Sequence, residues 1–315
     1  MIPSLVLHGG AGTIPLERMA PGELDAHHAC LRAALLAGHR VLAAGGPALE
    51  AVVAAVVALE DDPLFNAGRG AVFTRAGVQE MDAAVMDGAT LRAGAIAGLR
   101  GPRNPVLAAR AVMERSPHVL LAGEGALAFL RGQEVEFADD AYFHTDRRWD
   151  ALQRMLAGPE KVRDDADRHG TVGAAACDAA GHLAAATSTG GMTGKLPGRV
   201  GDTPLPGAGT WADAACAVSA TGHGESFIRI AAAHEVSARM RLAQEDLDAA
   251  AAGVMAALAA VGGTGGFVAL DRAGRWSLPF NTRGMYRGVV GADGAAWTGI
   301  YQEPLQRAAS RLGIG

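Results

Sequence analysis

The most chemically suggestive segment of the sequence is His169-Gly170-Thr171-Val172-Gly173, which opens an apolar run. A threonine hydroxyl is a weak nucleophile at neutral pH and needs a base to take its proton. A free α-amino group on the same residue, with a pKa of about 7.7–8.0, can be that base. Such an amine on Thr171 requires cleavage after Gly170, whose missing side chain leaves the scissile carbonyl accessible. The alternative is structural, because a Gly-Thr pair at the start of a strand is commonly a turn.

Two later segments carry groups that such a nucleophile would need. The first, Ala186-Thr187-Ser188-Thr189-Gly190-Gly191, places hydroxyl groups at the end of a strand, where they could polarise a nucleophile. The second, Gly198-Arg199-Val200-Gly201-Asp202, places a cation and an anion three residues apart. A guanidinium binds a carboxylate through two hydrogen bonds, and an aspartate accepts from an ammonium group. Arg199 and Asp202 could therefore hold the head group of an α-amino acid; a local salt bridge between them is the alternative.

A third segment, Ser219-Ala220-Thr221-Gly222-His223-Gly224-Glu225, runs from a predicted strand into a predicted helix. The Thr221 hydroxyl and the Gly222 N–H could form an oxyanion hole, in which one well-placed donor contributes about 3–4 kcal/mol. A plain turn between strand and helix would have the same residue types.

Composition limits the classes of function. The chain has 315 residues, of which 50% are hydrophobic, and a net charge of -5. This acidic balance argues against a nucleic-acid partner, which needs a basic face. The three cysteines are widely spaced, which indicates buried thiols in a reducing compartment. No signal peptide is apparent, and the most apolar stretch, Ala51 to Leu59, is too short to span a membrane. We expect a cytoplasmic protein without a membrane partner.

Hydrophobic periodicity and glycine turns predict a mixed α+β chain. Strands are expected at residues 4–7, 71–75, 79–86, 92–99, 171–177, 183–187 and 212–219, and in a closing hairpin of 266–271 and 276–280. Helices are expected at residues 21–44, 47–60, 104–115, 225–241 and 244–261. The charged stretch 146–169 is interpreted as an exposed, mobile linker. The two halves are either two domains or one domain with an expendable linker.

The run from His169 to Glu225 resembles the β-subunit of the plant-type asparaginase / isoaspartyl peptidase family of N-terminal nucleophile hydrolases. The resemblance extends over nearly the whole chain. It is also carried by His8-Gly9-Gly10-Ala11-Gly12, Phe65-Asn66-Ala67-Gly68, Met81-Asp82-Ala83, Met86-Asp87-Gly88, Arg103-Asn104-Pro105-Val106, Leu278-Pro279-Phe280-Asn281-Thr282 and Gly284-Met285. Asp202 and the glycines Gly190 and Gly191 favour this branch over the taspase-like and glycosylasparaginase branches.

The resemblance implies an αββα four-layer sandwich made by self-cleavage of one precursor. Residues 1–170, with a linker at about 140–170, would form the α-subunit, and residues 171–315 the β-subunit, together one structural domain. The activity implied is hydrolysis of L-asparagine and β-aspartyl dipeptides through an acyl-enzyme on Thr171. Thr189 would assist this nucleophile, and Asn66 would orient it.

The same resemblance assigns the remaining roles. Arg199 and Asp202 would bind the substrate's α-carboxylate and α-amine, Gly224 would offer its carbonyl to the amine, and Thr221 with Gly222 would form the oxyanion hole. No catalytic cofactor is implied. A structural sodium ion would be held by the backbone carbonyls of a loop, namely those of Leu59, Glu60, Asp62, Phe65, Ala67 and Arg69. A dimer of cleaved αβ units is also implied. Two alternatives stay open, an uncleaved amino-acid-binding homologue and a glycosylasparaginase, and His223 has no assigned role beyond a surface imidazole.

Overall fold

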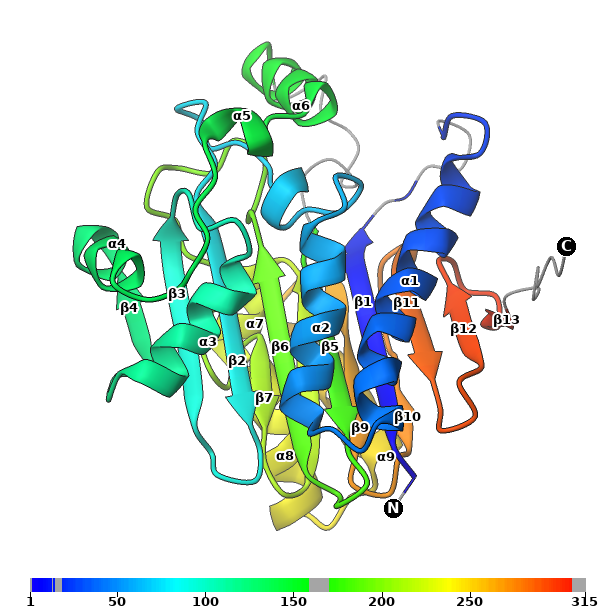
Figure 1. The fold of residues 1–315 in the computed structure, drawn as a ribbon. Coiled ribbons are helices and arrows are strands. Elements are labelled where there is room, and N and C mark those ends of the chain that lie inside the picture. The colour runs from blue at the N-terminus through cyan, green and yellow to red at the C-terminus, as the bar shows by residue number, and fades with distance from the viewer. Residues whose placement is uncertain (1, 13, 15–18, 159–169, 308–315) are drawn as a thin grey trace, which may run out of the picture.

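The apolar runs of the chain pair into two β-sheets of unequal size (Figure 1). The computed structural model describes residues 2–12, 14, 19–158 and 170–307. The larger sheet has nine strands in the order β13-β12-β11-β1-β5-β6-β2-β3-β4, and the smaller has four in the order β10-β9-β8-β7. These are a mixed α+β arrangement, as predicted.

The strands have the following bounds: β1 Ser4–Gly12, β2 Met81–Asp87, β3 Ala93–Leu99, β4 Leu120–Ala122, β5 Val172–Cys177, β6 Leu183–Thr189, β7 Thr210–Ala212, β8 Cys216–Gly222, β9 Gly265–Asp271, β10 Trp276–Ser277, β11 Gly284–Val290, β12 Ala296–Gly299 and β13 Gln306–Arg307. The helices are α1 Glu23–Ala43, α2 Ala48–Glu60, α3 Pro105–Arg115, α4 Gly123–Arg131, α5 Asp140–Phe143, α6 Asp146–Leu156, α7 Gly224–Ile230, α8 Ala232–Leu242 and α9 Leu247–Ala260, with a 3₁₀ turn η2 at Gly68–Gly70.

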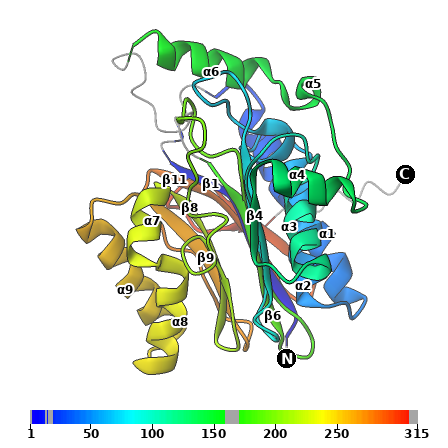
Figure 2. The same cartoon turned by 90° about the vertical axis from the view of Figure 1, so that its left-hand side faces the viewer.

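Helices cover the outer faces of the sheets. The helices α1, α2 and α3 contact the large sheet, whereas α8 and α9 contact β8 and β9 of the small sheet (Figure 2). The inner faces meet through contacts of β1, β5 and β6 with β8 and β9. The apolar residues Val52, Val56 and Leu59 of α2 recur at helical spacing and are fully buried, so burial of this face holds α2 on the sheet.

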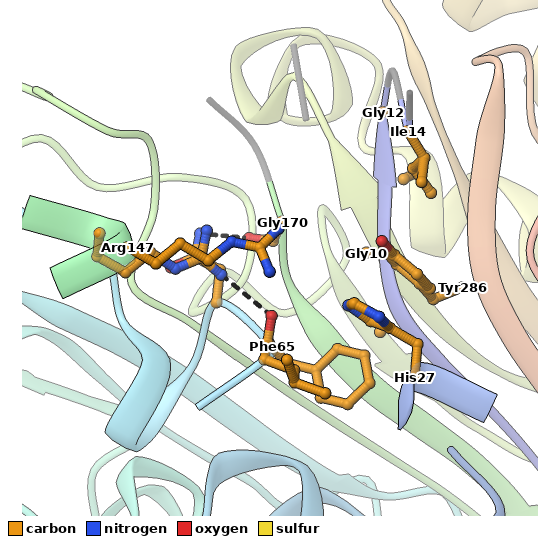
Figure 3. Close-up of a pocket in the computed structure, with 13 residues that line it drawn as sticks. Gly10, Gly12, Ile14, His27, Phe65, Arg147, Gly170 and Tyr286 are labelled. Atoms are coloured by element: carbon orange, nitrogen blue, oxygen red, sulfur yellow. Dashed lines mark hydrogen bonds between the residues drawn. The ribbon is translucent and has the colours of Figure 1, made fainter. Parts of the chain in front are cut away.

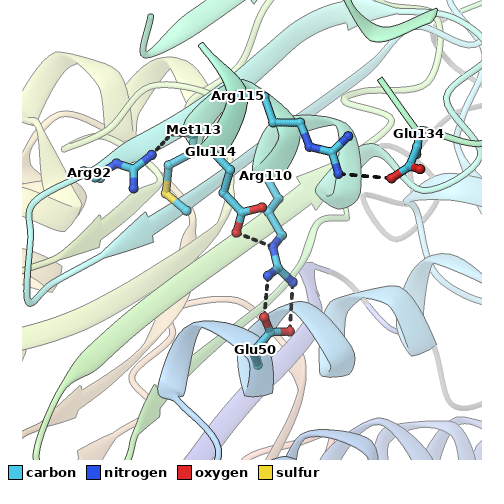
Figure 4. A network of polar contacts seen from close by, with 7 residues as sticks. All are labelled: Glu50, Arg92, Arg110, Met113, Glu114, Arg115 and Glu134. Carbon is cyan, nitrogen blue, oxygen red and sulfur yellow. Dashed lines mark hydrogen bonds and ion pairs between the residues drawn. The ribbon is translucent and has the colours of Figure 1, made fainter. Parts of the chain in front are cut away.

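Ion pairs also connect the outer helices α2 and α3. Arg110 of α3 donates to Glu50 of α2 at 2.8 Å and to Glu114, one turn further along its own helix, at 2.7 Å (Figure 4). Arg115 at the end of α3 pairs with Glu134, and Arg92 donates to the Met113 carbonyl. These pairs are partly exposed, so each contributes little to stability. No helix among the described residues is long and apolar enough to cross a membrane.

Most predicted elements occur with small shifts of their bounds, but the predictions for three strands or helices are wrong. Residues 71–75 form no strand: residues 71–74 have no regular secondary structure, Arg75 begins a turn, and Val72 N donates to the Asn66 side chain instead of a neighbouring strand. The expected strand 212–219 is two strands separated by a turn, where the Asp213 carboxylate accepts from Ala215 N and Cys216 N. The expected helix 225–241 breaks at Ala231, which has a φ of 49°.

The prediction of a mobile linker over 146–169 is wrong in its first part. Residues 146–156 form α6, which is capped by Thr145 accepting from Arg148 N. Ala151 and Leu152 are buried on its inner face. Most of the charges that suggested a loop occupy the other faces of an amphipathic helix, whereas Arg148 is buried with Ala151 and Leu152. Residues 159–169 lie outside the described part.

The expected closing hairpin is not the last structure of the chain. β11 follows it and pairs antiparallel with β1 in the large sheet. Its sequence, Gly284-Met285-Tyr286-Arg287-Gly288-Val289-Val290, interrupts apolar residues with glycine and arginine and so lacks a clear strand pattern. The short elements α4, α5 and β4 were also not predicted.

Candidate active site

The carbonyl oxygen of Gly170 lies among hydroxyl and amide groups from three parts of the chain. Thr171 Oγ1 lies 2.8 Å from this oxygen, and Thr189 Oγ1 lies 2.9 Å from it. Asn66 Nδ2 donates to it at 2.9 Å. The two threonine hydroxyls are 3.2 Å apart. Three residues singled out from the sequence, Thr171, Thr189 and Asn66, therefore meet at one carbonyl.

The Asn66 side chain is held at both ends of its amide group. Its Nδ2 also donates to Gly191 O at 2.7 Å, and its Oδ1 accepts from Val72 N at 2.9 Å. The residue is 2% exposed. A Cβ at Gly190 would lie 2.5 Å from Oδ1, so a side chain there would displace the amide. These contacts fix the direction in which Nδ2 donates.

The sheet brings these residues together because their strands are neighbours. Thr171 precedes β5 and Thr189 ends β6, and Val172 is paired with Ser188 across the two strands. The end of β1 lies on the other side of β5. There, Gly10 has a φ of +118°, and a Cβ on it would lie 3.2 Å from Gly170 Cα. Glycine at this position allows β1 to approach the Gly170–Thr171 bond closely.

A pocket opens beside this bond (Figure 3). Gly10 and Gly170 line it together with Arg147 from α6, and His27 and Tyr286 stack on one another at its edge with ring centroids 4.6 Å apart. The scissile bond expected from the sequence therefore borders a cavity rather than solid core.

The proposed oxyanion residues lie at the end of β8, beside the same end of β1. Thr221 is fully buried, and its Oγ1 accepts from Ala11 N at 3.1 Å, which leaves the hydroxyl hydrogen for a different acceptor. Gly222 has a φ of +145°, and a Cβ there would lie 2.4 Å from Thr264 O. A side chain at Gly222 is thus excluded by both conformation and space.

Arg199 binds a carboxylate, but not that of Asp202. Its Nε and Nη2 each donate to Glu225 at 2.9 Å, so the guanidinium makes a two-bond pair. The local Arg199–Asp202 salt bridge considered from the sequence is therefore not the arrangement found. The hydrogen bonds from Arg199 lower the pKa of Glu225 to about 2, so this carboxyl is ionised at neutral pH. His223 Nε2 lies 3.3 Å from Glu225 Oε2 and is 42% exposed, consistent with a surface imidazole.

Asp202 lies next to Arg199 and close to the backbone of Gly209 and Gly224. A Cβ at Gly224 would lie 2.7 Å from Asp202 Oδ1 and 3.1 Å from Arg199 Nη2, so the three predicted binding residues are neighbours. Asp202 is 5% exposed, and its Oδ2 has no hydrogen-bond partner among the described residues. Burial raises the pKa of this carboxyl to about 7. A buried carboxylate oxygen without a partner is suited to receive a cationic group.

Several side chains that support the site were missed from the sequence. Glu225 has no role in the sequence-based predictions, although it contacts Arg199 directly. Lys195 is buried and donates to Glu80 O at 2.7 Å, and Asp82 accepts from Gly98 N at 2.7 Å. Burial lowers the pKa of Lys195 and raises that of Asp82. In the sequence, Lys195 and Asp82 are each a lone charge within an apolar or glycine-rich run. Such a pattern becomes informative only once the burial of the side chain is known.

The loop expected to bind sodium brings backbone carbonyl oxygens close to two of its glycines. A Cβ at Gly68 would lie 2.6 Å from Glu60 O, and one at Gly70 would lie 2.0 Å from Phe65 O. Arg148 of α6 closes the loop from outside, with Nε donating to Gly70 O at 2.9 Å. Clustered carbonyl oxygens at positions where only glycine fits are compatible with a bound cation.

Comparison with known proteins gives the context for this geometry. The model of the asparaginase family matches residues 1–300. The chain belongs to the asparaginase family. It is 49% identical to the isoaspartyl peptidase of Salmonella typhimurium, over 95% of this chain and 98% of that protein. The isoaspartyl peptidase of Escherichia coli is 48% identical, over 95% and 96% of the two chains. The plant-type L-asparaginase of Thermococcus kodakarensis is 40% identical, over 90% and 94%. The resemblance found from motifs is thus confirmed, and the chain is a hydrolase.

Proposed function

We propose that this chain cuts itself after Gly170 and that the freed Thr171 hydrolyses L-asparagine and β-aspartyl peptides to release L-aspartate. The observation that carries the proposal is the Gly170 carbonyl, which receives hydrogen bonds from Asn66 and Thr189 while the Thr171 hydroxyl lies against it. The names of the relatives support the substrate class: isoaspartyl peptidase for the bacterial proteins, and isoaspartyl peptidase/L-asparaginase for the one in Xenopus laevis, which is 41% identical.

Self-cleavage begins with attack of Thr171 Oγ1 on the Gly170 carbonyl carbon. Negative charge develops on the carbonyl oxygen, where Asn66 Nδ2 and the Thr189 hydroxyl already donate. The C–N bond breaks, the hydroxyl proton passes to the departing nitrogen, and the Gly170 acyl group is left as an ester on Thr171. Water then hydrolyses this ester, which gives a Gly170 carboxylate and a free α-amine on Thr171.

Turnover uses the new amine as the base. It takes the Thr171 hydroxyl proton as the oxygen attacks the β-carbonyl of the substrate. The oxyanion rests on the Thr221 hydroxyl, whose own oxygen is engaged by Ala11 N, and on the Gly222 N–H. Ammonia or an amino acid leaves with the proton, and water releases aspartate from the acyl-enzyme. Asn66 orients the threonine, and Thr189 assists it.

The substrate's head group binds beside this centre. Arg199 Nε and Nη2 each donate one hydrogen to Glu225, so the guanidinium takes the α-carboxylate through the remaining N–H groups of Nη1 and Nη2. Ionised Asp202 takes the α-ammonium group, with the Gly224 carbonyl as a second acceptor. The partnerless Oδ2 of Asp202 supports this role.

A structural sodium ion fits the loop between α2 and β2. The residues that would hold it through their backbone carbonyls are Leu59, Glu60, Asp62, Phe65, Ala67 and Arg69. The glycine cradle at Gly68 and Gly70 supports this assignment, as does the all-oxygen donor set. Asn66 stands between two of these residues, so the ion's contribution would be to fix the loop that carries Asn66.

The arrangement of helices on both outer faces of two sheets supports the four-layer αββα fold of N-terminal nucleophile hydrolases. We further propose a dimer of cleaved αβ units acting on small molecules in the cytoplasm, without nucleic-acid or membrane partners.

Release of aspartate from L-asparagine and from β-aspartyl-leucine tests the proposal. The purified, cleaved protein should release aspartate from both, and Thr171→Ala should release none from either. Equal release by Thr171→Ala would refute the role of Thr171, and inactivity of cleaved protein on both compounds would refute the substrate class.

A further inference from the structure

A row of buried hydroxyl groups and one imidazole crosses the space between the two sheets, below the proposed active site. His8 on β1 contacts Ser219 on β8, with Nε2 2.9 Å from Oγ. Ser219 Oγ lies 2.7 Å from Thr187 Oγ1 on β6, which lies 2.7 Å from Thr210 Oγ1 on β7. All four side chains are fully buried. The roles proposed above use none of them.

At the His8 end of the row, a contact with the backbone of Thr171 fixes the tautomer of His8. Its Nδ1 lies 3.0 Å from the carbonyl oxygen of Thr171. A carbonyl oxygen can only accept, so Nδ1 carries the hydrogen. Burial lowers the pKa of His8 to about 3, and a neutral ring has one N–H. Nε2 is therefore an acceptor, and the hydroxyl of Ser219 donates to it.

The direction of the remaining hydrogen bonds follows, because a hydroxyl has one hydrogen. The Ser219 hydrogen is used by His8, so Thr187 donates to Ser219. The Thr187 hydrogen is then used as well, so Thr210 donates to Thr187. All bonds of the row point the same way, toward the Thr171 carbonyl, and hydrogen bonds aligned in this way polarise and strengthen one another.

Strand β5, which lies between β1 and β6 in the large sheet, leaves room for the row. β5 begins beside Thr171, and its Gly173 is paired with His8. A Cβ on Gly173 would lie 1.9 Å from Ser219 Oγ and 2.8 Å from His8 Nε2. Any side chain at Gly173 would therefore break the contact between His8 and Ser219. The glycine near the start of this buried strand therefore has a specific use.

The far end of the row reaches the loop that carries Asp202. Thr210 Oγ1 lies 3.0 Å from Thr203 O, so its hydrogen faces both this oxygen and Thr187. Gly209 N donates to Asp202 O at 3.1 Å. The row thus connects the backbone of the proposed nucleophile to the backbone beside the proposed substrate carboxylate.

We propose that His8 is a positioning residue, which as the neutral Nδ1–H tautomer holds the Thr171 carbonyl and links it through Ser219, Thr187 and Thr210 to the Asp202 loop. This inference rests on the proposed role of Thr171. His8 moves no proton in the reaction. By holding the Thr171 carbonyl, His8 fixes the position of the Thr171 hydroxyl relative to the carbonyl of the bound substrate.

The direct test is the tautomer of His8 in the wild-type cleaved protein. Two-bond ¹H–¹⁵N NMR correlations of ¹⁵N-histidine-labelled protein distinguish Nδ1–H, Nε2–H and imidazolium rings, and loss of one signal set in His8→Asn assigns His8. We expect the Nδ1–H pattern, unchanged between pH 6 and 8. An Nε2–H ring, or protonation within this range, would overturn the proposal. This result does not depend on whether the protein hydrolyses asparagine.

Kinetics separate positioning from a general loss of structure. Asparagine places its amide nitrogen near the position of a histidine Nδ1, so His8→Asn keeps a donor for the Thr171 carbonyl, whereas His8→Ala removes it. For variants whose complete cleavage is verified by mass, we expect His8→Ala to lower kcat by about 10- to 100-fold with little change in KM. His8→Asn should recover most of this loss.

Two further variants test the row itself. Thr187→Val keeps the shape of the side chain and removes the hydroxyl, so it should lower kcat in the same direction with KM unchanged. Thr298→Val, an equally buried threonine of β12, is the control and should leave kcat unchanged. Equal loss in His8→Asn and His8→Ala, or changes confined to KM, would contradict the proposal. Activity in Thr171→Ala would instead refute the proposed function.

Discussion

At the scale of single residues, the Gly170 carbonyl explains why two polar side chains from different elements lie at one place. Asn66 and Thr189 are both almost fully buried, and a buried polar group is costly unless it is hydrogen-bonded. Both donate to the Gly170 oxygen, which would carry negative charge during self-cleavage. These donors are in position before the reaction, so no reorganisation is required.

Removal of the Thr189 hydroxyl should therefore slow self-cleavage. Thr189→Val keeps the side-chain shape but loses one donor to the Gly170 oxygen, and we expect the cleavage rate to fall by about 10²- to 10³-fold. Freshly expressed protein followed over time on a denaturing gel gives this rate. Thr298→Val, at a distant buried threonine, should be cut as fast as wild type. Wild-type cleavage in Thr189→Val would exclude this role for the hydroxyl.

The Asp202 carboxyl predicts a particular pH dependence. Its pKa is raised by burial to about 7, and only the ionised form attracts the substrate's ammonium group. The Thr171 amine, with a pKa of about 7.7–8.0, must also be deprotonated. Because two groups must lose protons, log(kcat/KM) should rise with pH with a slope approaching 2 below about pH 6.

The variant Asp202→Asn tests this assignment. It removes one of the two ionisations, so kcat/KM should be lower and its slope against pH should fall to about 1. Asp271, as buried as Asp202 but at the opposite end of the small sheet, supplies the control Asp271→Asn, which should keep the slope of 2. An unchanged slope in Asp202→Asn would show that another group titrates.

At the scale of elements, α6 changes the interpretation of the region before the proposed cleavage point. Its Arg148 is 5% exposed, and the guanidinium donates to Gly70 O at 2.9 Å, with Leu64 O at 3.4 Å. Trp149 packs edge-on against Phe73, with ring centroids 5.2 Å apart. The helix is therefore fastened to the loop that carries Asn66.

Loss of the Arg148 guanidinium should destabilise the uncut chain. In a Thr171→Ala background, Arg148→Met keeps an unbranched side chain but leaves loop carbonyls without their charged donor, so the free energy of unfolding should fall by about 1–3 kcal/mol. The neighbouring Arg147, 43% exposed and paired with Glu23, is the matched control. Arg147→Met should change stability by less than about 1 kcal/mol. Urea titrations that gave the two variants equal stability would contradict this function of Arg148.

The sequence was most informative where a motif brings its own chemistry. The segment around Arg199 and Asp202 predicts these two as a binding pair, and they lie side by side with Gly224, which the family resemblance adds. Apolar periodicity predicts α2 and β5 directly. The partner of Arg199 and the contacts of His8 were not predictable in this way. Ser219 is 211 residues from His8, and such a contact exists only after two sheets have packed. β11 was missed because its pairing with β1, rather than its own alternation, makes it a strand.

At the scale of the whole molecule, the large sheet mixes strands from both sides of the proposed cleavage point. β1, β2, β3 and β4 precede Gly170, whereas β5, β6, β11, β12 and β13 follow it. β5 is inserted next to β1, and β6 next to β2. Cleavage would remove one peptide bond but none of these pairings. The two fragments that cleavage would produce could therefore not separate without breaking the sheet.

This topology predicts that the two fragments stay together after cleavage. On size-exclusion chromatography in native buffer they should elute in one peak at equal amounts, and they should separate only in denaturant. The shared hydrogen bonds of the nine-stranded sheet are the physical reason. Separate elution of the fragments under native conditions would show that the interleaved sheet does not survive cleavage.

The central claim is that the working nucleophile is created by a cut after Gly170, and the intact mass of the purified, active protein tests it most directly. We predict two masses, those of residues 1–170 and 171–315, with Thr171 as the new N-terminus, and a single uncut mass for Thr171→Ala. A single uncut chain that still releases aspartate, or a cut at any other bond in the active enzyme, would contradict the claim.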